Sequence, residues 1–241
     1  MNDPGEVVYL VDDDVSVRES ITDLLEHERV NIIGFESAPA FLRHRRADAA
    51  ACLLLDLQLP EMSGLELQEQ LVHTASLPII FISGRGDIPS SVRAMKGGAL
   101  EFLTKPIDCD ALIASVRTAF ATDRENRHYE AELAYLQQRL GRLSPREREA
   151  LPLIAAGFLN KQSAAMLGIT EVTLQVHRGQ IMKKMAATTF ADLVRMCGAL
   201  GISDTPPRWH RAAARYREAS GTPDALRLAL PPAAAPARFG R

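Results

Sequence analysis

The sequence predicts two folded domains: an α/β domain with a doubly wound, five-stranded parallel sheet, and a smaller all-α domain after it. Over the first 120 residues, short apolar runs alternate five times with amphipathic stretches, which is the pattern of repeated β–α units. The run at residues 52–55 is apolar without alternation, as is typical of a strand covered on both faces. From about residue 108 onward the apolar residues follow helical spacing.

The first domain is expected to span residues 1–120. Its expected strands are the apolar runs at 7–11, 31–35, 52–55, 78–82 and 101–103. Stretches with helical spacing separate them, at 16–27, 39–45, 64–73 and 88–96. In a parallel sheet of this kind, functional residues gather where the carboxyl ends of the strands meet.

The next segment, residues 121–142, is expected to be a helical linker that continues the last helix of the first domain. Neither Pro nor Gly interrupts the chain between residues 107 and 140. Five apolar residues recur at spacings of four and three, which is the seam of a short coiled coil: Tyr129, Leu133, Leu136, Leu140 and Leu143. The same spacing suits a helix that packs its apolar stripe on a neighbouring domain, and the sequence leaves both interpretations open.

The second domain is expected to span residues 143–202 as several short helices. It opens on Ser144-Pro145-Arg146-Glu147, which supplies an N-cap, a proline at the first helical position and a glutamate at the third. Residues 203–241 follow, with six prolines and ten alanines in 39 positions. This composition predicts a largely disordered tail, with a short helix at residues 212–219.

Charge and cysteine content limit the protein class. The net charge of −2 hides an asymmetry, because residues 1–120 carry 10 Lys and Arg against 19 Asp and Glu, whereas residues 143–200 carry 7 against 4. Different partners are therefore expected for the two halves. No apolar run approaches the ~20 residues that cross a bilayer, and three widely separated cysteines predict neither a disulfide framework nor a zinc site. We expect a soluble cytoplasmic protein.

Polar residues follow the expected strands of the first domain at the edge where a site should form. Three aspartates at 12–14 follow the first strand, Asp56 the third, Ser83 the fourth and Lys105 the fifth. Clustered carboxylates repel one another unless a cation neutralises them, and oxygen ligands favour Mg²⁺. Such a site allows one carboxylate to act as a nucleophile toward a phosphoryl group.

These residues and their order resemble the receiver domain of bacterial response regulators, over residues 5–120. Four stretches carry the resemblance: Val11-Asp12-Asp13-Asp14, Asp56-Leu57-Gln58-Leu59-Pro60-Glu61-Met62-Ser63-Gly64, Ile82-Ser83-Gly84 and Phe102-Leu103-Thr104-Lys105-Pro106. Each is weak alone, but all four occur in order and at strand ends. The resemblance implies a flavodoxin-like fold and a cis bond between Lys105 and Pro106.

The resemblance also implies a role for each site residue. Asp56 would accept a phosphoryl group from a cognate histidine kinase. Asp12, Asp13, Asp56 and the backbone carbonyl of Gln58 would hold Mg²⁺ or another small divalent cation, and Lys105 would pair with the phosphate. Apart from this self-catalysed phosphotransfer and the hydrolysis that reverses it, no enzyme activity is expected.

Ser83 and Phe102 resemble the switch pair of the same family. The hydroxyl of Ser83 would move to donate a hydrogen bond to the phosphoryl group, and the ring of Phe102 would enter the vacated space. An ordinary core position is the alternative interpretation of Phe102.

Residues 143–200 resemble the helix-turn-helix domain of the LuxR/FixJ type. The matching stretches begin at Leu143-Ser144-Pro145-Arg146-Glu147 and include Asn160-Lys161-Gln162, residues 167–178 and Ile181-Met182-Lys183-Lys184-Met185. The recognition helix would run from Glu171 to Met185 and enter the major groove. Carried over by position, the residues that face bases are Gln175, Val176 and Gly179, and those for backbone contact or support are Lys161, Thr173, His177, Arg178, Lys183 and Lys184. Packing in the core is the alternative for Val172, Val176 and Ile181.

Several residues depart from the pattern of that family. They are Pro152, Ser163, Gln175, Gly179 and Thr188. A missing phosphate contact weakens DNA binding and its dependence on salt, and a glycine inside a helix costs roughly 1 kcal/mol relative to alanine.

Both domains together resemble the FixJ/StyR-like branch of the NarL/FixJ response regulators. The predicted function is therefore a transcription factor in which phosphorylation of Asp56 controls dimerisation and sequence-specific DNA binding. The implied partners are a histidine kinase, double-stranded promoter DNA, a second copy of the chain and, as a further candidate, RNA polymerase. The alternative is a phosphorylation-dependent regulator whose second domain binds a protein instead of DNA.

Overall fold

The computed structural model describes residues 5–72, 77–84 and 88–202. Contacts between residues divide the chain after Ala131 into two compact units, and each unit is described separately. The tail expected at residues 203–241, with its short helix at 212–219, lies outside the described residues.

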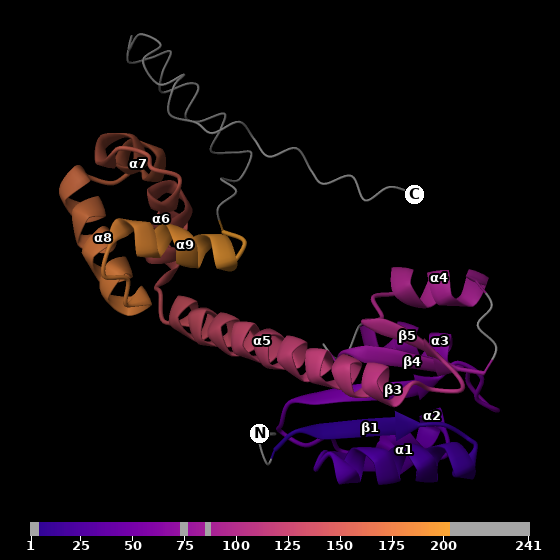
Figure 1. The fold of residues 1–241 in the computed structure, drawn as a ribbon. Helices are drawn as coiled ribbons and strands as arrows, with labels where there is room; N and C mark the ends of the chain where they lie inside the picture. Colours follow the sequence, from indigo (N-terminus) through magenta and orange to yellow (C-terminus); the bar gives the residue numbers. More distant parts are fainter. Residues whose placement is uncertain (1–4, 73–76, 85–87, 203–241) are drawn as a thin grey trace. The chain divides into compact units, whose positions relative to one another are not determined.

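The first unit contains a five-stranded parallel sheet, as the sequence predicts (Figure 1). The strands lie in the order β2-β1-β3-β4-β5, and they are β1 (Val7–Val11), β2 (Asn31–Phe35), β3 (Ala51–Asp56), β4 (Ile79–Ser83) and β5 (Glu101–Thr104). In register, Val11 lies beside Leu55, Asp56 beside Ile82, and Ser83 beside Thr104. The carboxyl ends of the strands therefore meet at one edge of the sheet.

Helices cover both faces of this sheet. They are α1 (Val15–His27), α2 (Ala38–Arg43), α3 (Gly64–Val72), α4 (Ile88–Lys96) and α5 (Cys109–Gly141). Successive strand residues point to opposite faces, so Val8 and Leu10 pack with α1 and α5, whereas Tyr9 packs with α2 and α3. Burial on both faces explains why the central strands are apolar without alternation.

Helix α5 continues beyond the first domain predicted from the sequence. Its residues Asp123, Arg124 and Arg127 contact the first unit: Asp123 accepts a hydrogen bond from the Ala51 amide at 2.9 Å, and the two arginines form ion pairs with Glu6 and Asp48. Residues 121–131 therefore group with the first unit, and the segment expected as a linker over residues 121–142 is divided between the two units.

The apolar seam predicted along α5 ends in the second unit. Leu140 and Leu143 pack against the core of that unit, whereas the side chain of Tyr129 is 56% exposed. The C-terminal end of the stripe is therefore part of the core of the second unit, and both interpretations of the whole stripe stay predictions.

The second unit consists of short helices around one core. They are α6 (Pro145–Ala155), α7 (Asn160–Leu167), α8 (Glu171–Met185) and α9 (Phe190–Ala199). Ser144 and Glu147 form the predicted capping box at the start of α6, and Thr170 caps α8. Gly168 ends α7 with φ +67°, a left-handed conformation that glycine adopts without steric cost. These local signals place α7 and α8 as consecutive helices joined by a tight turn.

Candidate functional site

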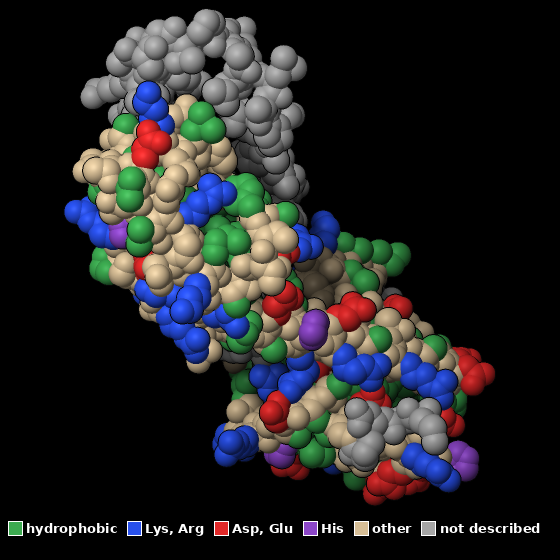
Figure 2. Space-filling model, turned by 90° about the vertical axis from the view of Figure 1, so that its left-hand side faces the viewer, with side chains coloured by type: hydrophobic (Ala, Val, Ile, Leu, Met, Phe, Trp, Pro, Cys, Tyr) green, Lys and Arg blue, Asp and Glu red, His purple; other side chains and the backbone are tan. Residues whose placement is uncertain are grey.

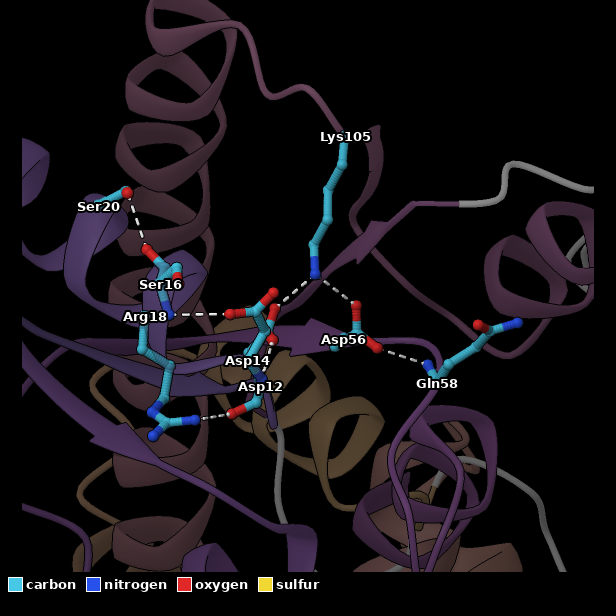
Figure 3. Close-up of polar contacts among 8 residues, drawn as sticks. All are labelled: Asp12, Asp14, Ser16, Arg18, Ser20, Asp56, Gln58 and Lys105. Atoms are coloured by element: carbon cyan, nitrogen blue, oxygen red, sulfur yellow. Dashed lines mark hydrogen bonds and ion pairs between the residues drawn. The ribbon is translucent and has the colours of Figure 1, made fainter.

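The polar residues predicted at the strand ends converge in the first unit. Asp12 follows β1, Asp56 ends β3, Ser83 ends β4, and Lys105 follows β5. Figure 3 shows the side chain of Lys105 reaching down between those of Asp12 and Asp56. Parallel topology alone brings these residues together, because they are separated by up to 93 positions in the chain.

A single ammonium group bridges the two buried carboxylates. Nζ of Lys105 lies 2.7 Å from Oδ2 of Asp12 and 2.9 Å from Oδ1 of Asp56. The side chains of Asp12 and Asp56 are 0% and 8% exposed, and that of Lys105 is 22% exposed. Two negative charges thus face one positive charge in a region where water screens poorly, which leaves the cluster short of positive charge.

Backbone contacts fix the orientation of both carboxylates. The Asp14 amide donates to Oδ1 of Asp12 at 2.9 Å, and the Gln58 amide donates to Oδ2 of Asp56 at 2.7 Å. Gly64 allows α3 to begin directly against this loop, because a Cβ atom there would lie 2.3 Å from the Asp56 carbonyl oxygen. Backbone amides therefore hold one oxygen of each carboxylate in place.

The surroundings also set the proton affinity of Asp56. Burial raises the pKa of Asp56 above its ordinary value, although hydrogen bonding and charge attraction from Lys105 oppose this effect. In Lys105, burial lowers the pKa, but the hydrogen bonds to Asp12 and Asp56 raise it overall. Lys105 is therefore the main group that opposes the effect of burial on the pKa of Asp56.

The donor atoms at this edge suit a hard divalent cation. Each carboxylate of Asp12 and Asp56 has one hydrogen bond on each oxygen, and a carboxylate has about four acceptor positions. The carbonyl oxygen of Gln58 accepts no hydrogen bond among the described residues. Oxygen-only donors with excess negative charge fit Mg²⁺, which retains several water ligands.

The structure does not assemble the complete set of metal ligands predicted from the sequence. Asp13 is exposed, and the described part of the chain has no group of three or more His, Cys, Asp or Glu side chains arranged around a metal position. Asp12 and Asp56 are together, whereas Asp13 stays a predicted ligand. Asp14 caps α1 by accepting from the Ser16 amide, as a carboxylate at a helix start should.

Ser83 and Phe102 lie on neighbouring strands beside the cluster. Ser83 is buried, and its carbonyl accepts from the Lys105 amide at 2.8 Å. The ring of Phe102 is half-buried and stacks on Phe81 with the ring centroids 6.3 Å apart. The backbone hydrogen bond between Lys105 and Ser83 connects the end of β4 to the segment that follows β5. The bond between Lys105 and Pro106 is cis, as the resemblance implies.

In the second unit, α8 presents one stripe to solvent and another to the core. Leu174, Ile181 and Met185 are buried. The exposed stripe consists of Val172, Gln175, Val176, Gly179 and Lys183. Core packing is the alternative interpretation of Val172 and Val176, but neither is buried: Val172 is 71% and Val176 58% exposed. Figure 2, which views the side of this unit on which α8 lies, shows apolar and basic side chains together at the surface.

Two predicted DNA-contact residues instead tie α8 to its neighbours. Nζ of Lys184 lies 2.9 and 2.7 Å from the two carboxylate oxygens of Glu147 on α6. The guanidinium of Arg178 lies over the ring of Phe190 and donates to Asn160 at 3.4 Å. Both side chains connect α8 to its neighbouring helices, and their predicted role in DNA contact or its support stays a prediction.

The other predicted contacts occupy the ends and flanks of α7 and α8. Lys161 is exposed at the start of α7, and His177 is half-buried. Thr173 is exposed and donates its amide to the capping oxygen of Thr170. Sequence reasoning missed Val172 as a surface residue, because apolar spacing does not distinguish a core valine from an exposed one.

A buried hydroxyl weakens the second unit. Ser163 on α7 is fully buried, and its Oγ has no hydrogen-bond partner among the described residues. We expect Ser163→Ala to stabilise this unit by about 1 kcal/mol, because it removes the desolvation cost of an unpaired hydroxyl and favours the helix. Native-state amide hydrogen exchange of α7 measures the change in the free energy of unfolding. Lower stability of the alanine variant would contradict the prediction.

Two further observations concern the helices and the cysteines of the chain. Within residues 5–72, 77–84 and 88–202, no helix has both the length and the apolar character that crossing a bilayer demands. Cys52, Cys109 and Cys197 are free thiols, and burial raises the pKa of Cys197 to about 11.

Comparison with known proteins identifies both units. Residues 8–117 match the response regulator receiver domain, and residues 141–197 match the bacterial regulatory proteins of the luxR family. Nodulation protein W of Bradyrhizobium diazoefficiens is 44% identical over 198 residues, which cover 82% of this chain and 87% of the relative. The response regulator protein TmoT of Ectopseudomonas mendocina is 43% identical over 81% of this chain and 90% of its own.

A solved structure supports the same assignment. The structure of the response regulator StyR matches with a TM-score of 0.68 and 42% sequence identity, over 80% of this chain and 98% of that chain. The predicted family and fold class are thus confirmed. The chain belongs to the NarL/FixJ family of response regulators, transcription regulators in which a receiver domain precedes a LuxR-type DNA-binding domain.

Proposed function

We propose that Asp56 is the phosphoacceptor of this response regulator and that its phosphorylation controls DNA binding by the second domain. The observation that carries this proposal is the buried Asp56 carboxylate, held by the Gln58 amide and by Lys105 at the carboxyl edge of the sheet. Its burial and fixed orientation prepare one oxygen as a nucleophile.

In the proposed transfer, a carboxylate oxygen of Asp56 attacks the phosphorus of a phosphohistidine on the kinase. The new P–O bond forms as the P–N bond breaks, and the histidine imidazole leaves with the bonding electron pair. Lys105 follows the negative charge from the carboxylate to the equatorial phosphoryl oxygens. Mg²⁺ held by Asp12, Asp13, Asp56 and the Gln58 carbonyl supplies further charge neutralisation when bound.

The same carboxylate would lose its phosphoryl group to water, so the signal ends without a second enzyme. Ser83 lies at the end of the neighbouring strand, from which its hydroxyl can donate to a phosphoryl oxygen on Asp56. Because the Lys105 amide is bonded to the Ser83 carbonyl, a shift of Ser83 would move the β5 end and the half-buried Phe102. This movement is our proposal for the switch.

Phosphorylation is proposed to produce a dimer that binds paired half-sites in the bacterial cytoplasm, where both the kinase domain and the chromosome are accessible. Helix α4 presents apolar side chains to solvent, Ile88 at 78%, Val92 at 44% and Met95 at 46% exposure, and so offers a surface for a second copy. Two linked DNA-binding domains gain affinity through effective concentration. Such a complex on DNA would recruit RNA polymerase.

The test compares full-length protein with and without acetyl phosphate and Mg²⁺. We expect the phosphorylated protein to double its mass in light scattering. It should also bind duplexes selected from a random library at least about tenfold more tightly, with an affinity that falls as salt rises. Equal affinity of both forms for DNA would reject the proposal. Recovery of no duplex at all would favour the alternative, a second domain that binds a protein.

A further inference from the structure

The exposed stripe of α8 carries little charge for a surface that contacts DNA. Four of its five residues are uncharged: Val172, Gln175, Val176 and Gly179. The fifth residue, Lys183, lies in the last turn of α8, and a second lysine, Lys161, lies at the start of α7. Phosphate contacts are therefore available from these lysines, and the uncharged residues of the stripe are left for contact with base edges.

Two valines lie in the N-terminal half of this stripe. Val172 and Val176 are 71% and 58% exposed, and residues four apart lie on the same face of a helix. Their separation along the axis is about 6 Å, roughly two base-pair steps. The major groove offers one apolar group at a base edge, the 5-methyl of thymine. The two valines are thus spaced to meet methyl groups on thymines within two base-pair steps of each other.

Packing within the second unit does not explain the glycine on this stripe. A Cβ atom at Gly179 would have no heavy atom of the described residues within 4 Å, so alanine fits the second unit. The glycine nevertheless weakens the helix. A missing side chain in the middle of the stripe allows a flat surface such as stacked base pairs to approach the helix backbone closely.

A protein partner fits this stripe less well than DNA. Helix-binding grooves on proteins use a continuous apolar row of several residues along the helix. This stripe has only two valines, with Gln175 between them in sequence and Gly179 and Lys183 after them. Residues 143–200 also carry 7 basic against 4 acidic residues, which complements a phosphate backbone.

We propose that Val172 is a specificity-determining residue that selects thymine through its 5-methyl group, in concert with Val176, and that Gly179 permits the close approach this contact needs. The inference rests on the proposed DNA-binding function and names the bases that the domain reads.

The test uses full-length protein activated with acetyl phosphate and duplexes selected from a random library. We expect each recovered half-site to contain thymines within two base-pair steps of one another. Replacing one of them by uracil removes only the methyl group and should lower the affinity about fourfold, the effect of one buried methyl-sized group. The same number of uracils placed outside the half-sites is the control and should change nothing.

Variants assign the methyl contact to its residue. Val172→Ala should bind the thymine duplex about fourfold more weakly, and it should lose the preference for thymine over uracil at one position while keeping it at the other. Val176→Ala should show the complementary loss. Because both side chains are exposed and alanine favours a helix more than valine does, neither variant should lower the melting temperature. Gly179→Ala should melt at a higher temperature and yet bind the selected duplex more weakly.

The outcomes separate this inference from the function on which it rests. A recovered motif whose affinity is unchanged by uracil, or a uracil effect that persists in both valine variants, overturns the thymine contact and leaves DNA binding in place. Gly179→Ala binding as tightly as the wild type overturns the role of the glycine. Failure to recover any DNA overturns the DNA-binding function, and the inference with it.

Discussion

Asp56→Asn is expected to take up no phosphoryl group under conditions in which the wild type is modified completely. An amide nitrogen or oxygen at this position is a far weaker nucleophile than the carboxylate, and the described site presents only one other buried carboxylate, Asp12, which lies deeper at 0% exposure. Intact-protein mass spectrometry after incubation with acetyl phosphate and Mg²⁺ measures the modification. The light-scattering dimer and the gain in DNA affinity should be absent from the same variant.

A matched control distinguishes loss of the nucleophile from loss of a negative charge at this edge of the sheet. Asp14→Asn removes a neighbouring negative charge, and asparagine caps a helix as well as aspartate does, so α1 should keep its capping bond to the Ser16 amide. This variant should be phosphorylated like the wild type. An Asp56→Asn protein that acquired an acid-labile phosphoryl group at a comparable rate would refute the assignment of the phosphoacceptor.

Glu147→Ala is expected to destabilise the DNA-binding domain by about 2–3 kcal/mol. The carboxylate of Glu147 is 6% exposed, accepts from the Ser144 amide at 2.7 Å and pairs with Lys184. The variant loses a capping box and a largely buried ion pair. The loss stays below that of a fully buried pair, because the side chain of Lys184 is 32% exposed and water can solvate its charge. Hydrogen exchange of α6 and α8 amides measures the change.

Two further variants apportion this effect. Glu147→Gln keeps the capping interaction, since glutamine also serves at this position, and it should cost about 1–2 kcal/mol through loss of the ion pair. Glu149→Gln, two positions away on the exposed side of α6, is the control and should change stability by less than about 0.5 kcal/mol. Equal stability of Glu147→Ala and Glu149→Gln would contradict the importance of the buried pair.

The pH dependence of the same pair has a definite sign. Burial would raise the pKa of Glu147, but the hydrogen bonds from Lys184 and Ser144 lower it overall. A carboxyl group with a lowered pKa in the folded state contributes stability above its unfolded pKa and loses it as pH falls through the folded value. The second unit should therefore lose stability on acidification, and Glu147→Gln should lack that component.

Much of the fold was predictable because its signals are local. The apolar runs of the central strands, the Ser144 cap and the turn at Gly168 each depend on a few neighbouring residues. Strand ends were less predictable: the third strand, expected at residues 52–55, extends over Ala51–Asp56, because pairing with β1 and β4 on both sides prolongs it. Asp56 is consequently the last residue of β3, and its place in the sheet beside Ile82 of β4 leaves it buried.

The sequence by itself determined the order of two domains, the aspartates and the lysine of the proposed phosphoryl site, and the helix proposed to face DNA, because periodicity, caps and motif order are properties of adjacent residues. Only the tertiary structure decided which charges are paired and which apolar side chains are exposed. Lys184 pairs with Glu147, 37 positions away, and Lys105 lies between Asp12 and Asp56, 93 and 49 positions away. Such pairings depend on how distant elements pack, so no local pattern distinguishes Lys184 in its ion pair from Lys183 in solvent, or the exposed Val172 from the buried Ile181.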